Sequence, residues 1–177
     1  MELERNTSGE PPPWPAGEGP RILAYLRPMQ GGLVPILEAL KACKARVLLR
    51  VSGIVPKKIA QFVRPGMTIT ERQIDFKQAA QDCDAFLTYA PHNTVLEFLL
   101  AGKPGVLVPD LHERILTARR AVQMGACIAP KRDDKVQVTA ALDRIITDPA
   151  PRKAAQAFAE KWKHLDRSQV IPHLVDE

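Results

Sequence analysis

Short apolar runs alternate along the chain with longer segments in which apolar residues recur at helical spacing. The runs are rich in Val, Ile and Leu and have the length of β-strands, and they cover residues 22–26, 46–51, 67–70, 85–89, 105–108 and 126–129. A helical pattern follows each run, and the last is followed by two helices, expected near 136–147 and 151–164. Because these strands are apolar throughout, they are typical of a parallel sheet covered on both faces. The pattern predicts an α/β fold, a Rossmann-like parallel sheet of about six strands with helices on both faces.

The two ends of the chain differ in composition from the part between them. Residues 1–20 are polar and rich in Pro and Gly, a composition that buries too little apolar surface to offset the entropy of ordering. We therefore expect a flexible linker or arm at 1–20, one Rossmann-like domain at 21–165 and a C-terminal tail at 166–177. An arm of this kind indicates that another segment once preceded it.

Composition and charge narrow the function classes. The net charge is +5 over 177 residues, but the basic residues are spread over predicted helices, so we expect no nucleic-acid partner. The three cysteines are far apart in apolar surroundings, which favours reduced core thiols over a disulfide framework or a metal site. The sequence contains no apolar stretch of membrane-spanning length and its N-terminus lacks the apolar core of a signal peptide. We expect no membrane span and a cytoplasmic location.

The stretch YAPHNTVLEFLLAGKP joins the fourth predicted strand to a helix. Thr94 followed by Glu97 is a capping box, and Asn93 is the alternative N-cap, so the helix is predicted to begin near Thr94. The free N–H groups and the dipole of such a helix end also attract anions when the end lies beyond the carboxyl edge of a sheet. The two interpretations are compatible.

The order of residues around this joint resembles a known signature. From Asp84 the chain reads DAFLTYAPHNTVLEFLLAGKPGVLVPDLHERILTARRAVQMGA, which is similar to the donor-binding segment of nucleotide-sugar-dependent glycosyltransferases of the GT-B class, UDP-glycosyltransferase-like. The matching positions are the polar pair Asn93 and Thr94, the acid Glu97, the turn Gly102 and Pro104, the strand end Pro109, the acid Glu113, and the helix landmarks Ala118 and Gly125. Tyr89 stands where the family has a His, and Ala90, Pro91 and Asn93 stand at its flexible Gly positions.

The resemblance implies that the chain is the C-terminal, donor-binding half of such an enzyme. Its substrate would be a UDP- or TDP-linked nucleotide sugar, with no separate cofactor and no metal. Its partner would be the N-terminal acceptor-binding domain, which supplies the catalytic base, so this half contains no catalytic residue and is not expected to act alone. Transfer in the family is metal-independent.

The resemblance also assigns roles to individual residues. The implied nucleotide-sugar-binding residues are His92, Asn93, Thr94, Glu97, Glu113 and Arg114. Glu97 would hold the ribose, Glu113 the sugar, and His92 would face a phosphate. Arg114 would either bind an acidic sugar or pair with Glu113, and the pairing is the interpretation we favour. Because Gln73 or Ile74 stands where many members have an aromatic residue, backbone groups of the loop at 71–75 would have to read the base.

Other nucleotide-binding families fit the sequence less well. The glycine fingerprint of dinucleotide-binding proteins is absent after the first strand, and no P-loop is present. Two alternatives stay open. One is a degenerate GT-B module that has an interaction or regulatory role and binds no nucleotide, and the other is half of a sugar-nucleotide epimerase.

Overall fold

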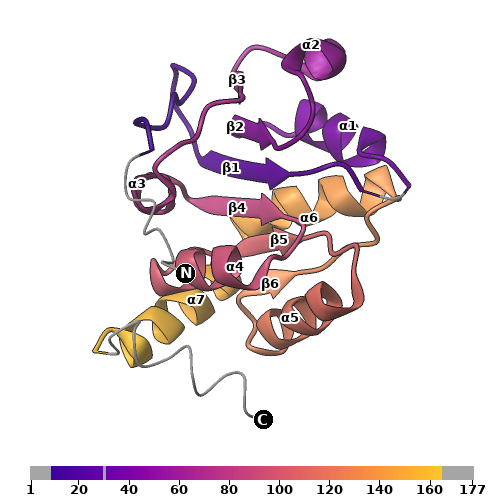
Figure 1. Cartoon of the computed structure of the whole chain (residues 1–177). Coiled ribbons are helices and arrows are strands. Elements are labelled where there is room, and N and C mark those ends of the chain that lie inside the picture. Colours follow the sequence, from indigo (N-terminus) through magenta and orange to yellow (C-terminus); the bar gives the residue numbers. More distant parts are fainter. Residues whose placement is uncertain (1–8, 30, 165–177) are drawn as a thin grey trace, which may run out of the picture.

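The computed structural model describes residues 9–29 and 31–164, in which strands and helices alternate along the chain (Figure 1). The strands are β1 (Arg21–Leu26), β2 (Arg46–Val51), β3 (Met67–Thr70), β4 (Ala85–Thr88), β5 (Gly105–Leu107) and β6 (Cys127–Ile128). The helices are α1 (Val34–Ala42), α2 (Pro56–Ile59), the 3-10 helix η1 (Ala60–Phe62), α3 (Phe76–Asp82), α4 (His92–Leu100), α5 (His112–Gln123), α6 (Lys135–Thr147) and α7 (Pro149–Trp162). The C-terminal tail predicted at 166–177 lies outside the described residues.

The six strands form one all-parallel sheet in the order β3-β2-β1-β4-β5-β6, which confirms the predicted fold class. The register pairs Leu23 with Leu48 and with Phe86, so apolar residues of three strands line up across one face. The chain moves outward from β1 to β2 and β3 on one side, and from β4 to β5 and β6 on the other. The order of the strands therefore reverses between β1 and β4.

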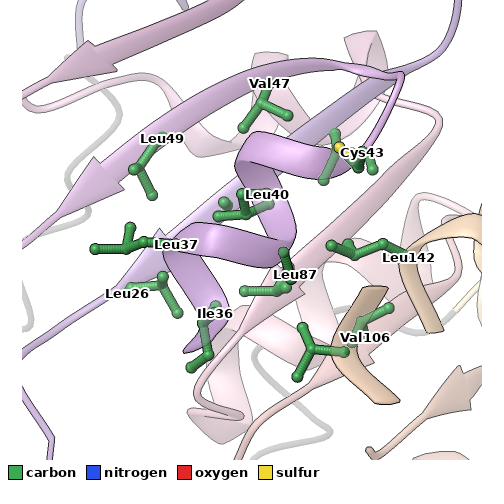
Figure 2. Packing of buried hydrophobic residues seen from close by; sticks show 14 of the residues in the cluster. Leu26, Ile36, Leu37, Leu40, Cys43, Val47, Leu49, Leu87, Val106 and Leu142 are labelled. Carbon is green, nitrogen blue, oxygen red and sulfur yellow. The ribbon is translucent and has the colours of Figure 1, made fainter. Parts of the chain in front are cut away.

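Helices cover both faces of the sheet, and each face has its own core. On one face the buried residues of α1 and α6 pack against β1, β2, β4 and β5, with Ile36, Leu40 and Leu142 fully or almost fully buried (Figure 2). On the other face α3, α4, α5 and α7 pack on the sheet, and the rings of Phe86 and Phe98 stack with centroids 4.5 Å apart. Burial of a large apolar side chain stabilises a fold by about 1.5–3 kcal/mol. The helices hold the sheet from both sides and leave its carboxyl edge to the loops.

All three cysteines are buried and none forms a disulfide, as the sequence predicts. Within the described part of the chain, no helix has the length and hydrophobicity required to cross a bilayer.

Candidate functional site

The reversal of strand order between β1 and β4 marks the position where ligands of open parallel sheets bind, just beyond the carboxyl ends of the strands. The loops that follow these two strands begin at Arg27 and Tyr89. The loop after β5 lies beside them, since Val108 N–H donates to the Thr88 carbonyl over 2.9 Å. Side chains from three separate segments therefore meet at this edge.

The joint between β4 and α4 has an unusual backbone. Ala90 is fully buried and has a φ of 63°, in the left-handed region that a side chain disfavours. Pro91 follows in an extended conformation (φ −66°, ψ 132°) and is the N-cap of α4. Val95 N–H donates to the Pro91 carbonyl over 3.0 Å, which is the first hydrogen bond of the helix. The backbone N–H groups of His92, Asn93 and Thr94 thus form the open first turn.

The predicted capping box is wrong. The helix begins at His92, two residues before the predicted start, and no side chain caps it. Thr94 already lies within the first turn and Glu97 in the second, so neither occupies the cap position that the motif requires. Pro91 has no side-chain acceptor, so as N-cap it leaves the first N–H groups of the helix without a side-chain cap.

A compact charged cluster lies next to this joint. Asp110 accepts a hydrogen bond from Arg114 Nη1 at 2.6 Å and from Arg27 Nη2 at 3.1 Å, one on each carboxylate oxygen. Both guanidinium groups also lie over the ring of Tyr89, at 4.7 Å for Arg114 and 5.1 Å for Arg27. We call Arg27, Tyr89, Asp110 and Arg114 the arginine cluster. It ties the loops after β1, β4 and β5 together at the point where the strand order reverses.

Arg132 adds a further positive charge beside the cluster. Its Nη1 donates to the Pro109 carbonyl over 3.1 Å, and its Nη2 lies 4.0 Å from where a Cβ of Gly31 would stand. Gly31 and Gly32 have φ values of 84° and 80°, which side-chain-bearing residues rarely adopt. The turn after β1 is therefore brought close to the loop after β6.

The chain is similar to two known transferases that use UDP-linked sugars by name, although no family model matches it. It is 26% identical over 150 residues to UDP-glycosyltransferase 2 of Phaeomoniella chlamydospora, which covers 82% of this chain and 33% of that protein. Over 94 residues it is 33% identical to a UDP-N-acetylglucosamine–N-acetylmuramyl-(pentapeptide) pyrophosphoryl-undecaprenol N-acetylglucosamine transferase of Rhodospirillum centenum, covering 50% of this chain and 25% of that one. This chain therefore spans a third or less of either relative.

Solved structures decide the fold. The glycosyltransferase VinC, in complex with DTDP, superimposes with a TM-score of 0.72 at 19% identity over 90% of this chain and 42% of its own. The calicheamicin glycosyltransferase CalG4 gives 0.69 at 24% identity, over 86% and 39%. The chain has the fold of the C-terminal half of a GT-B glycosyltransferase. The resemblance read from the sequence is confirmed.

Within this fold, the predicted site residues lie on two helix starts. His92 and Asn93 are exposed at the first turn of α4, and Thr94 and Glu97 are half-buried on the same helix. Glu113 is exposed at the start of α5. These five positions follow strands β4 and β5, and their roles in ligand binding stay predictions.

Arg114, the sixth predicted residue, is the one whose contacts differ from expectation. It pairs with Asp110 and not with Glu113. Glu113 and Arg114 are consecutive in a helix, so their side chains point in different directions, whereas Asp110 lies four residues before Arg114 and on the same side. The favoured pairing with Glu113 is therefore wrong, and Arg114 is directed at Tyr89 and the joint before α4.

Sequence reasoning missed Asp110 and named neither Arg27 nor Tyr89 as a site residue. The spacing of four between Asp110 and Arg114 was the available signal for their pairing. Nothing in the sequence indicates that Arg27, 83 positions away, shares the same carboxylate. That contact follows from the parallel sheet, which places the ends of β1 and β5 at one edge.

The surroundings of the arginine cluster keep Asp110 ionised and Tyr89 neutral. Burial disfavours ionisation of Asp110, but the hydrogen bonds from Arg114 and Arg27 outweigh it and lower its pKa. Burial, together with a hydrogen bond to Tyr25, raises the pKa of Tyr89 to about 12. At neutral pH the cluster therefore contains two guanidinium groups, one carboxylate and a neutral phenol.

The N-terminal arm contacts the loop after β3. Glu10 N–H donates to the Gln73 carbonyl, and Asp75 N–H donates to the Glu10 carbonyl, each over 2.9 Å. Ile74 between them is buried, and Trp14 of the arm packs in the core on that face. The loop in which backbone groups were expected to read a base is thus held by the described part of the arm, residues 9–20. The flexibility predicted for 1–20 stays a prediction for residues 1–8, which lie outside the described part.

Proposed function

We propose that this chain binds the nucleotide-sugar donor of a glycosyltransferase and that catalysis requires an N-terminal acceptor-binding half. One observation carries the proposal: an open helix end, at α4, lies where the strand order reverses and next to an excess of positive charge. The free N–H groups and the dipole of α4 favour an anion, and the arginines strengthen that preference. The relatives support the class of ligand, since their names include UDP-dependent transferases and a complex with DTDP.

In this proposal the donor lies along the carboxyl edge of the sheet. The diphosphate rests on the N–H groups of His92, Asn93 and Thr94. Glu97, in the next turn of α4, holds the ribose, and Glu113 and Arg114 at the start of α5 face the sugar. The nucleotide is UDP or TDP.

The mechanism is metal-independent glycosyl transfer, in which the bond between the anomeric carbon and the diphosphate oxygen breaks. A bond forms from the acceptor hydroxyl to that carbon, and a base on the other half takes the hydroxyl proton. The electron pair of the broken bond stays on the diphosphate, so negative charge grows there. The α4 dipole, fixed before the reaction, stabilises that charge without reorganisation.

A second candidate is a GT-B module that binds no nucleotide and serves in an interaction. Three features of the joint favour it. Tyr89 is 8% exposed and its ring is covered by two guanidinium groups, Ala90 carries a methyl where Gly would leave room, and Pro91 offers no N–H. Binding and interaction differ in whether the intact chain recognises nucleoside diphosphates.

The deciding experiment is isothermal titration and thermal shift of the chain with UDP, dTDP, ADP and GDP. A ligand at one hundred times its Kd should stabilise the fold by about 2.7 kcal/mol. Glu97→Gln should weaken the binding of the preferred nucleotide and leave the fold intact. The matched control is Glu38→Gln on α1, an acid that is half-buried like Glu97 but lies on the opposite face of the sheet, and this variant should bind like the parent. No binding to any of the four nucleotides would refute the donor-binding proposal in favour of the interaction module.

A further inference from the structure

The carboxyl edge of the sheet holds more positive charge than one carboxylate balances. Arg27, Arg114 and Arg132 gather there, and Asp110 is the acid that pairs with the first two, so three positive charges and one negative charge leave an excess of two. Arg27 Nε is buried and has no hydrogen-bond partner among the described residues. The side chain of Arg27 is 34% exposed and that of Arg114 is 13% exposed, while Arg27 Nε is itself closed to solvent. The cluster therefore retains net positive charge for a further anion, and of these two arginines Arg27 has the larger exposed fraction.

The geometry of the cluster suits a carboxylate. The Asp110 carboxylate already lies between the two guanidinium groups and accepts a hydrogen bond from each, which demonstrates that both forks converge on a group of this size and charge. Guanidinium forks match the planar carboxylate with parallel hydrogen bonds. Both guanidinium groups already stack on the ring of Tyr89, which restricts their motion. Little further side-chain entropy is therefore lost when a ligand binds to them.

We propose that Arg27 and Arg114 select a donor whose sugar carries a carboxylate, a nucleoside diphosphate hexuronate. The inference rests on the proposed function, in which the first turn of α4 takes the diphosphate. The uracil or thymine base is uncharged at neutral pH, so any further negative charge of such a donor must be on its sugar. Tyr89 lies three residues before the first turn of α4, and this places the arginines that cover its ring beside the diphosphate.

The test uses pairs of ligands that differ only at C6 of the sugar. The full chain is titrated calorimetrically, at low salt, with UDP and dTDP and then with the glucose and glucuronate derivatives of whichever nucleotide binds. The glucuronate derivative should bind at least about tenfold more tightly than the glucose derivative, the factor expected for one charge-assisted hydrogen-bonded pair. Arg114→Gln should abolish this preference and lower the affinity for the nucleoside diphosphate by a much smaller factor than the affinity for the glucuronate derivative. Arg114→Lys keeps the charge without the fork and should retain part of the preference.

Arg120→Gln, an exposed arginine in the last turn of the same helix, is the matched control and should bind like the parent. Circular dichroism of each variant establishes that it is folded. Equal affinity for the glucose and glucuronate derivatives would overturn this inference while the proposed function stands. An Arg114→Gln variant that loses affinity equally for the nucleoside diphosphate and for the glucuronate derivative would also overturn it, because the guanidinium would then serve the phosphates. If neither UDP nor dTDP binds, the failure lies in the proposed function and the inference falls with it.

Discussion

Replacing Asp110 with Asn should destabilise the chain by about 2 kcal/mol at pH 7. The Asp110 side chain is 5% exposed and accepts one hydrogen bond from each of two guanidinium groups. A hydrogen bond to a charged group contributes about 1.5–3 kcal/mol. Asparagine keeps one oxygen as acceptor, so one of the two bonds is lost and its NH2 group faces a second donor. Arg27 is partly exposed, so solvent screens its interaction with Asp110. The expected loss of stability therefore lies in the lower part of this range.

Urea unfolding followed by circular dichroism measures this change, and for a chain of this size it corresponds to a fall in Tm of about 4–8 °C. Asp133→Asn is the control, because Asp133 is 59% exposed and lies 3.8 Å from Lys131. Loss of such an exposed pair should change stability by less than about 0.5 kcal/mol. An Asp110→Asn variant as stable as the parent would show that the arginine cluster does not contribute to the free energy of unfolding.

The pH dependence of the stability difference between the parent and Asp110→Asn tests whether the charge of the Asp110 carboxylate causes that difference. The pKa of Asp110 is lowered in the folded chain, because the hydrogen bonds from Arg114 and Arg27 outweigh the effect of burial. A lowered pKa means that the carboxylate contributes its full stabilisation above the ordinary aspartate value of about 3.9. The contribution is lost as the pH falls through the folded pKa. The difference in stability between parent and Asp110→Asn should therefore be constant between about pH 5 and 8 and shrink at lower pH, and a difference that grew on acidification would contradict the sign.

Three further predictions concern the core and the arm. Gly105→Ala places a Cβ 2.3 Å from the Phe86 ring and should cost about 1–3 kcal/mol in urea unfolding, part of which Phe86→Leu in the same chain should restore. Gly9→Ala places a Cβ 2.2 Å from the backbone of the loop after β3, so it should release the arm to protease cleavage and lower the urea midpoint, because Trp14 of the arm packs in the core. Burial raises the pKa of Cys83 and Cys127 to about 12, so the native chain at pH 8 should react slowly with iodoacetamide and the urea-unfolded chain should react at all three thiols.

The sheet was predictable because its strands are buried on both faces. The run RVLLRV was assigned to 46–51, the bounds of β2, since consecutive apolar residues have few alternatives to a covered parallel strand. The start of α4 was not predictable in the same way. A side-chain capping motif was available at Thr94, but the extended backbone of Pro91 begins the helix two residues earlier. Sequence motifs identify residues that could serve as the N-cap of a helix. The backbone conformation after the preceding strand decides at which residue the helix begins.

The site was predictable where it follows one helix and not where it depends on contacts between loops. A helix beginning at the carboxyl edge just after β4 was predicted, because strand and helix are adjacent in sequence, although its first turn was placed two residues too late. The partner of Arg114 was assigned incorrectly, because the sequence neighbour Glu113 was preferred to a residue one turn away. The second partner of Asp110 comes from the loop after β1, and only the strand order brings it there.

The backbone at Ala90 helps to decide between the two proposed functions. Among the described residues Ala90 is the one non-glycine residue with positive φ, a conformation that costs roughly 1–2 kcal/mol relative to the right-handed region. Strain of this size persists only where the surroundings fix the backbone, and it concentrates at functional sites. The residue is fully buried between β4 and the first turn of α4, so the turn from strand to helix is made without the glycine that would make it free of strain. The strain at Ala90 therefore favours donor binding, whereas its methyl group, which takes the room that a Gly would leave, favours the interaction module.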